Sequence, residues 1–261
     1  MNAKQIEAAL RDLPLASLRY YEQIGSTNDV ALAWATEGAA DFSLVVADEQ
    51  TTGRGRAGRK WYTASGATLA FSLILHPRLE EQVLPALFSG LGALALAQTI
   101  RKSFRLTAQI KWPNDVLLQG RKLAGVLVEA TWLGEQIESL ILGMGVNVSA
   151  AALPPAEKLD FPATSLEDVL KQPVDRLPFL HDLLADLIEW RLKLGTKEFL
   201  EAWEKALAYR GEQVQIWTED APPLTGELLG LESDGALRLK SPQGRPLSIH
   251  FGDVRLRPVE V

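Results

Sequence analysis

Apolar residues recur along most of the chain with two periods, one typical of helices and one typical of strands. Apolar residues three or four positions apart, which share one helix face, predict helices at 3–13, 25–38 and 82–103 and two more within 176–208. Shorter apolar or alternating runs predict strands at 18–23, 42–50, 66–75 and 136–148, and three strands joined by turns within 108–132. This order predicts an α+β fold with a mixed β-sheet flanked by helices.

The pattern changes at about residue 211, after a proline-interrupted stretch at 154–178 and the last predicted helix. From there, short alternating strands are separated by turn residues, as at 233–236 and 242–246. Such a pattern predicts a small β-barrel of about fifty residues. We therefore expect two domains, a larger one at 1–210 and a smaller one at 211–261.

Composition narrows the class of protein. Of the 261 residues, 47% are hydrophobic and 23% are charged, which is typical of a globular chain. No run of about 18 apolar residues occurs, so no membrane span is predicted. Residues 1–14 carry polar positions at helical intervals and lack the apolar core of a signal peptide. We therefore expect the protein in the cytoplasm.

Cysteine is absent, which excludes a thiol nucleophile, disulfides and cysteine-ligated metals. The three histidines, His76, His181 and His250, have no neighbour at metal-ligand spacing, so no metal site built by the protein is predicted. Any catalysis would therefore depend on positioning and on cationic side chains.

One loop runs against the overall charge of −6. Between Gly53 and Lys60 it carries four cations and three glycines: Arg54, Arg56, Arg59 and Lys60, with Gly53, Gly55 and Gly58. Glycines let backbone N–H groups turn toward an anion, and guanidinium groups suit phosphate or carboxylate. The alternative is a solvated charge run. The loop lacks the P-loop pattern and no predicted helix follows it, which argues against a dinucleotide-binding motif.

A second polar cluster surrounds a predicted hairpin and contains Lys111, Asn114, Asp115, Arg121 and Lys122. Both lysines are predicted where apolar strands begin, in company with a carboxylate that can orient them or help hold a metal. The alternative is a well-formed hairpin with polar edges. A third candidate is the glycine-rich strand end at 143–147, where the backbone can approach a ligand closely.

Together these stretches resemble the biotin protein ligases, also called biotin–[acetyl-CoA-carboxylase] ligases. The resemblance covers about residues 18–261. It rests on G-R-G-R-x-G-R-x-W at Gly53–Trp61, K-W-P-N-D at Lys111–Asp115 and G-R-K-L-A-G at Gly120–Gly125, and S-T-N at Ser26–Asn28 together with Gln50 completes the family's biotin-site pattern. The C-terminal stretches GALRLK at 235–240 and FGDVRLRP at 251–258 also match.

The resemblance implies a class II synthetase-like core, shared with lipoate ligases, and an SH3-like C-terminal barrel. Bifunctional members also carry an N-terminal winged helix-turn-helix domain, for which the residues before 18 are too few. We therefore expect the monofunctional type, without DNA binding. Edge strands of the sheet could pair in a homodimer, which periodicity does not decide.

The activity that the resemblance implies has two steps. Biotin's carboxylate displaces pyrophosphate from ATP to give biotinyl-5′-AMP. A lysine of a biotin carboxyl carrier protein domain, in acetyl-CoA carboxylase or a related carboxylase, then attacks this mixed anhydride. Cationic side chains and Mg²⁺ would offset the repulsion between the carboxylate and the phosphates. Neither step needs a nucleophile from the enzyme, which agrees with the absence of cysteine.

The resemblance also implies the site. The expected catalytic residues are Arg56, Lys111, Asp115 and Lys122. The expected ligand-binding residues are Ser26, Thr27, Asn28, Gln50, Thr51, Gly53, Arg54, Gly55, Arg56, Ala57, Arg59, Trp61, Asn114, Lys122, Gly125 and Asn147.

Roles follow from these positions. The side chains of Ser26–Asn28 and Gln50 would hydrogen-bond the ureido ring of biotin, and Gly55–Ala57 would bring backbone and a guanidinium to the carboxylate and phosphate. Lys122 would bind the carboxylate or bridging oxygen and Lys111 the phosphates.

Three of the expected roles stay open. Asp115 would orient the attacking lysine or a metal. Trp61 would stack on adenine or serve as a core aromatic residue, and Asn147 would touch the nucleotide or satisfy a strand end.

Two other functions compete with this one. A lipoate or octanoate ligase would share the fold, but its fatty chain has no need of a polar cluster like Ser26–Asn28, and the transferase with a cysteine nucleophile is excluded. A nucleic-acid-binding module would use the basic loop and the barrel. The net charge of −6 argues against a broad phosphate-binding surface.

Overall fold

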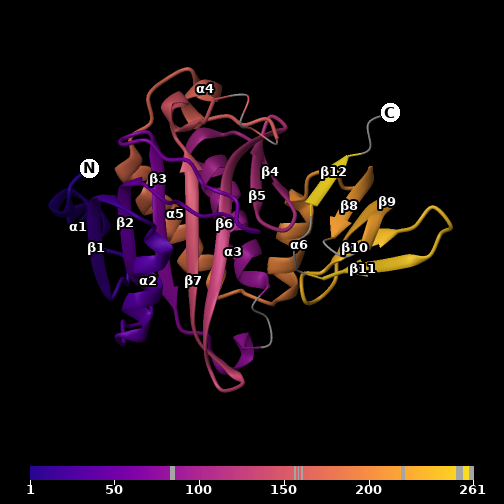
Figure 1. Ribbon diagram of the computed structural model, residues 1–261, viewed down its shortest axis with the longest axis horizontal. Helices are drawn as coiled ribbons and strands as arrows, with labels where there is room; N and C mark the ends of the chain where they lie inside the picture. Colours follow the sequence, from indigo (N-terminus) through magenta and orange to yellow (C-terminus); the bar gives the residue numbers. More distant parts are fainter. Residues whose placement is uncertain are drawn as a thin grey trace.

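The computed structural model describes residues 1–82, 86–155, 157, 159, 161–218, 221–250 and 255–258, arranged around two β-sheets (Figure 1). The first sheet contains β1 (Ser17–Ile24), β2 (Ser43–Gln50), β3 (Thr68–Leu75), β4 (Ala108–Lys111), β5 (Asp115–Leu118), β6 (Arg121–Leu133) and β7 (Gln136–Asn147). Its strand order is β1-β2-β3-β7-β6-β5-β4, and only β1 and β2 pair in parallel. The predicted mixed sheet is therefore confirmed.

Helices cover both faces of this sheet. They are α1 (Ala3–Leu10), α2 (Thr27–Thr36), α3 (Leu87–Phe104), α4 (Leu166–Leu170), α5 (Arg176–Arg191) and α6 (Lys197–Ala206), with short 3₁₀ turns η1 (Leu79–Glu81) and η2 (Ala150–Ala152). Helix α2 lies on one face, while α3 and α5 pack together on the other (Figure 1). None of the described helices is long and apolar enough to cross a membrane.

Strand alternation explains the two faces. Side chains of successive strand residues point to opposite sides of a sheet. In β2, β3 and β7, Val45, Ile74 and Ile141 pack under α2, whereas their neighbours in sequence join the large core beneath α3 and α5. The apolar runs that predicted buried strands therefore serve two cores at once.

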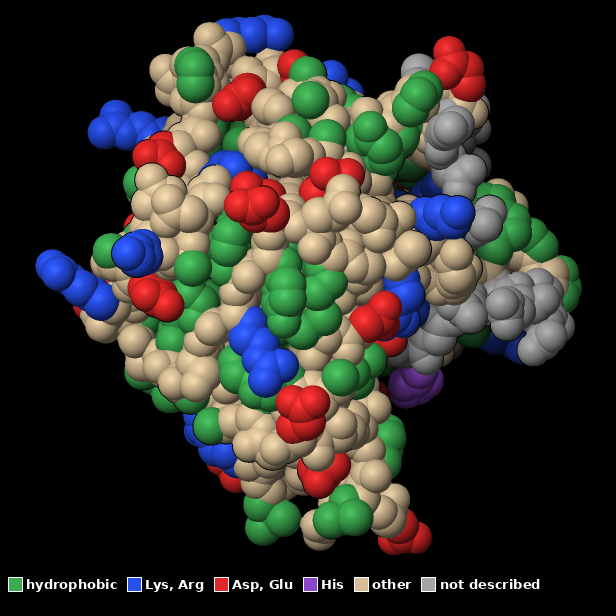
Figure 2. Space-filling view, turned by 60° about the vertical axis from the view of Figure 1, so that its left-hand side comes forward, with side chains coloured by type: hydrophobic (Ala, Val, Ile, Leu, Met, Phe, Trp, Pro, Cys, Tyr) green, Lys and Arg blue, Asp and Glu red, His purple; other side chains and the backbone are tan. Residues whose placement is uncertain are grey.

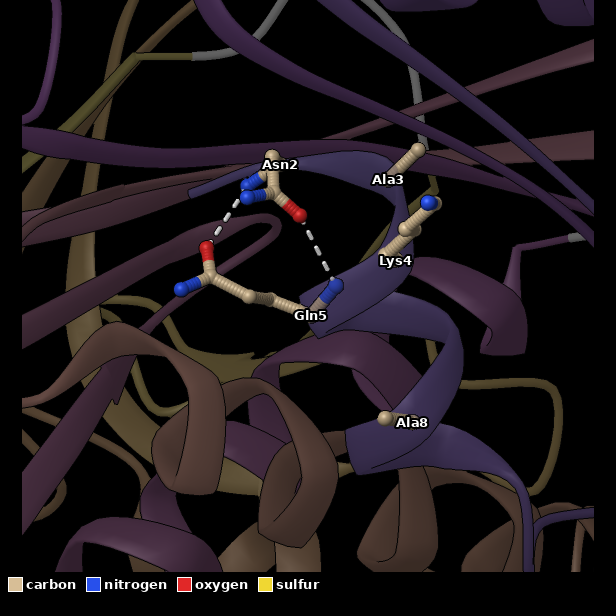
Figure 3. A pocket seen from close by; sticks show the side chains of 5 residues that line it. All are labelled: Asn2, Ala3, Lys4, Gln5 and Ala8. Atoms are coloured by element: carbon tan, nitrogen blue, oxygen red, sulfur yellow. Dashed lines mark hydrogen bonds between the residues drawn. The ribbon is translucent and has the colours of Figure 1, made fainter.

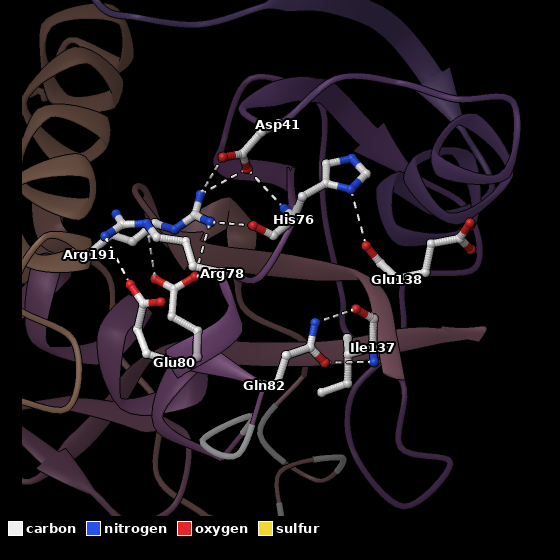
Figure 4. Close-up of polar contacts among 9 residues, drawn as sticks. Asp41, His76, Arg78, Glu80, Gln82, Ile137, Glu138 and Arg191 are labelled. Atoms are coloured by element: carbon white, nitrogen blue, oxygen red, sulfur yellow. Dashed lines mark hydrogen bonds and ion pairs between the residues drawn. The ribbon is translucent and has the colours of Figure 1, made fainter. Parts of the chain in front are cut away.

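A buried arginine ties α5 to the end of β3 (Figure 4). The Arg191 guanidinium donates to both carboxylate oxygens of Asp41, at 2.8 and 3.0 Å, and to the carbonyl of His76 at 2.7 Å. Glu81 lies 3.3 Å from the same group. Since the arginine side chain is 1% exposed and paired, this network is structural, and none of its members is a predicted site residue.

The second sheet is antiparallel, in the order β11-β10-β9-β8-β12. Its strands are β8 (Gln213–Thr218), β9 (Ala221–Leu231), β10 (Leu237–Lys240), β11 (Pro246–Ile249) and β12 (Arg255–Pro258), which fits the predicted small barrel. It packs against the first unit at Gly235, whose carbonyl accepts from Trp112 Nε1 at 3.1 Å. The domain division at 210/211 stays a prediction, and residues 251–254 of the quoted C-terminal stretch lie outside the described residues.

Two predicted helix boundaries need correction. The first helix ends at Leu10 instead of residue 13. Gln82 closes the η1 turn and does not begin the long helix, whose described part starts at Leu87, while 83–85 lie outside the described residues. Asn2 caps α1 through a reciprocal pair of hydrogen bonds with Gln5, of 2.9 and 3.0 Å (Figure 3). The surface pocket beside this cap contains no predicted site residue.

Candidate functional site

The α2 face of the sheet lacks side chains along one track. Gly143 and Gly145 of β7 lie on this face. The residues that alternate with them, Met144 and Val146, enter the large core on the other face. The strand register sets Gly145 opposite Gly125 of β6, and Gly125 opposite Asp115 of β5. Other side chains fill the space that these glycines leave, and they come from the sequence motifs.

Asn28 covers Gly143. A Cβ at residue 143 would lie 2.0 Å from Asn28 Oδ1, so only glycine fits beneath this amide. The side-chain oxygen accepts from Ser72 Oγ at 2.6 Å, and Nδ2 donates to Glu129 Oε2 at 2.7 Å. Asn28 is 3% exposed, and Ser26 and Thr27 are equally buried. Their burial gives the first turn of α2 the character of a small polar pocket in an apolar surrounding.

A side chain from β2 caps the start of α2. Ser26 occupies the N-cap position, but its side chain makes no capping hydrogen bond. Gln50, at the end of β2, takes that part: its Oε1 accepts from Thr27 N at 2.8 Å and from Thr27 Oγ1 at 3.1 Å. Gln50 is thereby held beside Thr27 and Asn28.

The glycine-arginine loop forms a short hydrogen-bonded hairpin. Trp61 N donates to the Gly53 carbonyl at 2.9 Å, and Gly55 N donates to the Arg59 carbonyl at 2.7 Å. Ala57 and Gly58 turn the chain with φ of 54° and 66°. A Cβ at residue 53 would lie 2.5 Å from the Trp61 carbonyl, which explains the first glycine.

The loop cations have different surroundings. Arg54 pairs with Glu129 through two hydrogen bonds of 2.8 Å and with Asp29 at 2.6 Å. Two carboxylates therefore already neutralise one of the four cations that the sequence offers to an anion. Arg56 is half-buried, whereas Arg59 and Lys60 are exposed.

Trp61 connects the loop to the sheet. Its indole lies over Gly125 and Gly145, and Lys122 Nζ lies 5.5 Å from the ring centroid. Trp61 Nε1 is buried and has no hydrogen-bond partner within the described chain. Buried donors are normally satisfied, so this N–H is a group that a bound ligand can accept from.

A cationic cluster lies next to Trp61. Asp115 Oδ1 is 2.6 Å from Lys122 Nζ, and Asp115 Oδ2 accepts from Lys111 Nζ at 3.1 Å. Arg257 of β12 and Lys111 both contact the ring of Phe161. Lys111 Nζ lies 4.5 Å from the ring centroid, and the Arg257 guanidinium lies 4.8 Å from it. Two ammonium groups thus engage one carboxylate, a third cation lies near Lys111, and the excess positive charge favours an anion.

Burial changes the ionisation of this cluster. It lowers the pKa of Lys111 to about 8, although Asp115 partly opposes the change. Burial alone would raise the pKa of Asp115, but the ammonium groups of Lys122 and Lys111 outweigh it and hold that pKa below its usual range. The sequence-based placement of Lys111 at a strand start is wrong: it ends β4, while Lys122 lies near the start of β6 as predicted.

Other predicted residues make contacts within the protein. Asn114 Nδ2 donates to the Val126 carbonyl at 2.9 Å, and Asn147 Nδ2 donates to the Thr164 carbonyl at 3.1 Å. Thr51 is exposed and its backbone bonds the Ile24 carbonyl. These contacts support structural roles for the three residues, and their predicted contact with ligand stays a prediction.

Sequence reasoning missed Ser72 and Glu129. Each interrupts an otherwise apolar stretch of a strand, Ser72 in β3 and Glu129 in β6. A polar residue at a buried strand position is the signal that could have identified them.

The described residues do not build a Mg²⁺ site. No group of three or more His, Cys, Asp or Glu side chains lies together in the described part of the chain. Asp115, the carboxylate of the cationic cluster, is engaged by two ammonium groups, whereas Mg²⁺ needs free oxygen ligands.

Known proteins resemble this chain in sequence. Residues 20–147 match the model of the biotin/lipoate A/B protein ligase family. A biotin–[acetyl-CoA-carboxylase] ligase of Paracoccus denitrificans is 35% identical over 84% of this chain and 92% of its own. The bifunctional ligase/repressor BirA of Bacillus subtilis is 32% identical over 92% of this chain and 74% of its own.

The fold comparison agrees. The biotin protein ligase of Aquifex aeolicus, solved in complex with biotin and ATP, superposes with a TM-score of 0.81 at 29% identity, covering 94% of this chain and 100% of that one. The chain thus belongs to the biotin/lipoate A/B protein ligase family and, within it, to the biotin protein ligases.

Proposed function

We propose that the protein activates biotin with ATP as biotinyl-5′-AMP and transfers the biotinyl group to one lysine of a biotin carboxyl carrier domain of acetyl-CoA carboxylase or a related carboxylase. One observation supports this most. Strand β6 carries the cationic cluster at Lys122 and the polar pocket at Glu129, with Trp61 over the glycine track between them. A molecule with a polar uncharged ring at one end and a carboxylate at the other suits this layout.

The first step joins two anions. A carboxylate oxygen of biotin bonds to the α-phosphorus of ATP, and the bond from that phosphorus to the β-phosphate bridging oxygen breaks to release pyrophosphate. Lys122 and Lys111 would lower the repulsion between the reactants and stabilise the charge of the transition state. Asp115 keeps both ammonium groups aimed at one place, which is the orienting role we assign to it.

The second step needs a neutral amine. The carrier lysine attacks the carbonyl carbon of the mixed anhydride, AMP leaves with the bond electrons, and the amine loses its proton. Positioning is the main contribution of the protein to this step, because the anhydride is already activated. Mg²⁺ would enter with the phosphates of ATP, since the described side chains offer it no ready site.

The pocket favours biotin over lipoate or octanoate. The hydroxyl of Thr27 and the amide of Asn28 are buried and the amide of Gln50 is partly buried, and a fatty chain would leave their remaining capacity for hydrogen bonds to a ligand unused. A ureido ring offers both donors and acceptors. Specificity for biotin would then follow from hydrogen bonds that the ureido ring gains and a fatty chain does not.

The nucleic-acid alternative finds little support on the visible surface. On the face shown in Figure 2, Lys and Arg side chains are scattered among Asp and Glu and form no continuous basic stripe. A broad phosphate-binding surface requires clustered cations. The cytoplasmic location, the absence of DNA binding and a homodimer stay predictions.

The test uses the full chain with biotin, Mg-ATP and an apo carrier domain. Biotin-dependent exchange between ATP and labelled pyrophosphate reports the first step, and intact mass of the carrier reports the second. We expect exchange with biotin and a gain of one biotinyl group on one lysine. Exchange with lipoate or octanoate but not with biotin would support the lipoate or octanoate ligase. The proposal would be refuted if none of these acids supported either pyrophosphate exchange or a mass gain of the carrier.

A further inference from the structure

Glu129 has more contacts than a strand residue needs for folding. Its Oε1 accepts from Arg54 Nη1 at 2.8 Å, and its Oε2 accepts from Arg54 Nη2 at 2.8 Å and from Asn28 Nδ2 at 2.7 Å. The carboxylate side chain is 24% exposed, so these hydrogen bonds are partly shielded from water. One carboxylate therefore bonds both the loop and the polar pocket.

The contact with Asn28 fixes the orientation of its amide. An asparagine amide has nearly the same shape in two orientations related by a half-turn, and its neighbours select one of them. Ser72 Oγ donates to Asn28 Oδ1, while the ionised Glu129 can only accept. A half-turn would set the amide oxygen against the carboxylate, so Glu129, together with Ser72 and the Leu127 carbonyl 3.4 Å from Nδ2, determines which group Asn28 presents.

The contact with Arg54 fixes the base of the loop. Arg54 forms a β-bridge with Lys60, which closes the hairpin that carries Arg56 and Ala57. The paired hydrogen bonds between guanidinium and carboxylate give a defined geometry, and Asp29 at the start of α2 adds a third oxygen. The hydrogen bonds to Glu129 raise the pKa of Arg54 further above its ordinary value, in keeping with a permanent cation.

We propose that Glu129 is a positioning residue that couples the biotin pocket to the glycine-arginine loop. By holding Asn28 and Arg54 together it orders the amide for the ureido ring and places the loop over the same ligand. The inference rests on the function proposed above, because biotin is the ligand that both parts would contact. Arg54 then serves as an anchor of the loop.

A purely structural salt bridge makes a different prediction. Partly exposed ion pairs contribute about 0–1 kcal/mol to folding, so a structural role would change the melting temperature slightly and biotin binding not at all. A positioning role changes biotin affinity and loop closure while ATP affinity without biotin stays the same. The two roles are therefore separable in one set of variants.

The experiment measures biotin affinity by calorimetry, ATP affinity without biotin, release of the adenylate and melting temperature. For Glu129→Gln, which keeps the size but loses the charge, we expect biotin affinity to fall about tenfold or more, the scale of one lost charge-assisted hydrogen bond. ATP affinity should stay within about twofold. Adenylate release should be faster than in the wild type.

Two further variants separate the contacts. Asp29→Asn removes a carboxylate that contacts Arg54 and leaves the contact between Glu129 and Asn28 in place. This variant should therefore release the adenylate faster, with little change in biotin affinity. Glu135→Gln, at an exposed site on the β6–β7 turn, is the matched control for removing one negative charge and should behave as the wild type.

The outcomes are distinct. Unchanged biotin affinity in Glu129→Gln overturns the proposal, and so does equal weakening of biotin and ATP, which would indicate general damage. If Asp29→Asn reduces biotin affinity as much as Glu129→Gln, the orientation of Asn28 is not what matters and the coupling is refuted. Biotin binding by the wild type tests the proposed function separately, because it does not depend on any of these variants.

Discussion

The indole of Trp61 lies against the backbone of Gly145 so closely that a Cβ at residue 145 would stand 2.3 Å from Nε1. Non-bonded carbon and nitrogen atoms do not tolerate that separation, so a side chain at 145 and this position of Trp61 exclude each other. The relationship joins the end of the glycine-arginine loop to strand β7. It also explains why the strand end at 143–147 has a glycine at position 145: the Trp61 indole occupies the space that a side chain there would need.

Gly145→Ala should therefore displace Trp61. We expect a loss of stability of about 1–3 kcal/mol from overpacking, and adenylate formation reduced more than tenfold. Calorimetric unfolding and pyrophosphate exchange measure the two effects. In a Trp61→Ala background the same substitution should cost much less stability, because the clash is gone. Equal destabilisation in both backgrounds would show that the contact with Trp61 is not the cause.

Lys122→Ala should slow adenylate formation far more than it affects folding. Lys122 is 25% exposed and lies 2.6 Å from Asp115, so it contributes charge to the site more than packing to the core. Loss of one positioned cation at a developing charge typically costs about a hundredfold in rate. Arg121→Ala, next in sequence and outside the cationic cluster, is the matched control. Normal adenylation in Lys122→Ala would contradict the assigned role.

The lowered pKa of Lys111 should make both the stability of the protein and its binding of anions depend on pH. Its folded pKa of about 8 is below its ordinary value of 10.5, because of burial and of the nearby cations Arg257 and Lys122, which together outweigh Asp115. The unfolded chain therefore binds more protons between these values, and the contribution of Lys111 to stability rises with pH across that window. Binding of an anion should change in the opposite direction, because it needs the protonated amine.

We expect kcat/KM for ATP in adenylate formation to fall above about pH 8, by at most about tenfold per unit. A pH series from about 6.5 to 9.5 in the wild type and in Lys111→Ala measures this. The variant should be slow throughout and should lack the alkaline fall that Lys111 causes. A wild-type profile that stays flat up to the highest pH would disprove the role of protonated Lys111.

Arg56→Gly should weaken the hold on the adenylate. The arginine is half-buried on the hairpin that Arg54 anchors, and we expect its guanidinium to contact the adenylate. Losing one charge-assisted contact of about 1.5–3 kcal/mol should speed adenylate release roughly ten- to a hundredfold. The variant should still make adenylate and should label lysines of bystander proteins. Arg59→Gly, an exposed position on the same loop, provides the comparison, and equal release from the wild type and Arg56→Gly would contradict the prediction.

Much of the fold was determined locally. Periodicity placed every strand of the first sheet and the main helices, since period two and period 3.6 are imposed by backbone geometry itself. The errors fall at element ends, as at Leu10 and Gln82, where capping contacts decide the boundary. The sequence also identified the polar residues of α2, the basic loop and the two lysines, because their composition conflicts with an ordinary core.

Only the tertiary structure decided which of these residues meet. Strands β2 to β5 separate Asp29 from Glu129 in sequence, and β3 to β5 separate Arg54 from Glu129, so nothing local pairs them. The same is true of Arg257 beside Lys111, which comes from the second sheet. The physical reason is that period and composition are properties of neighbouring residues, whereas register across a sheet sets which distant residues face one another. The sequence by itself therefore determined the parts of the site, and the register of β3, β7, β6 and β5 determined the glycine track that joins them.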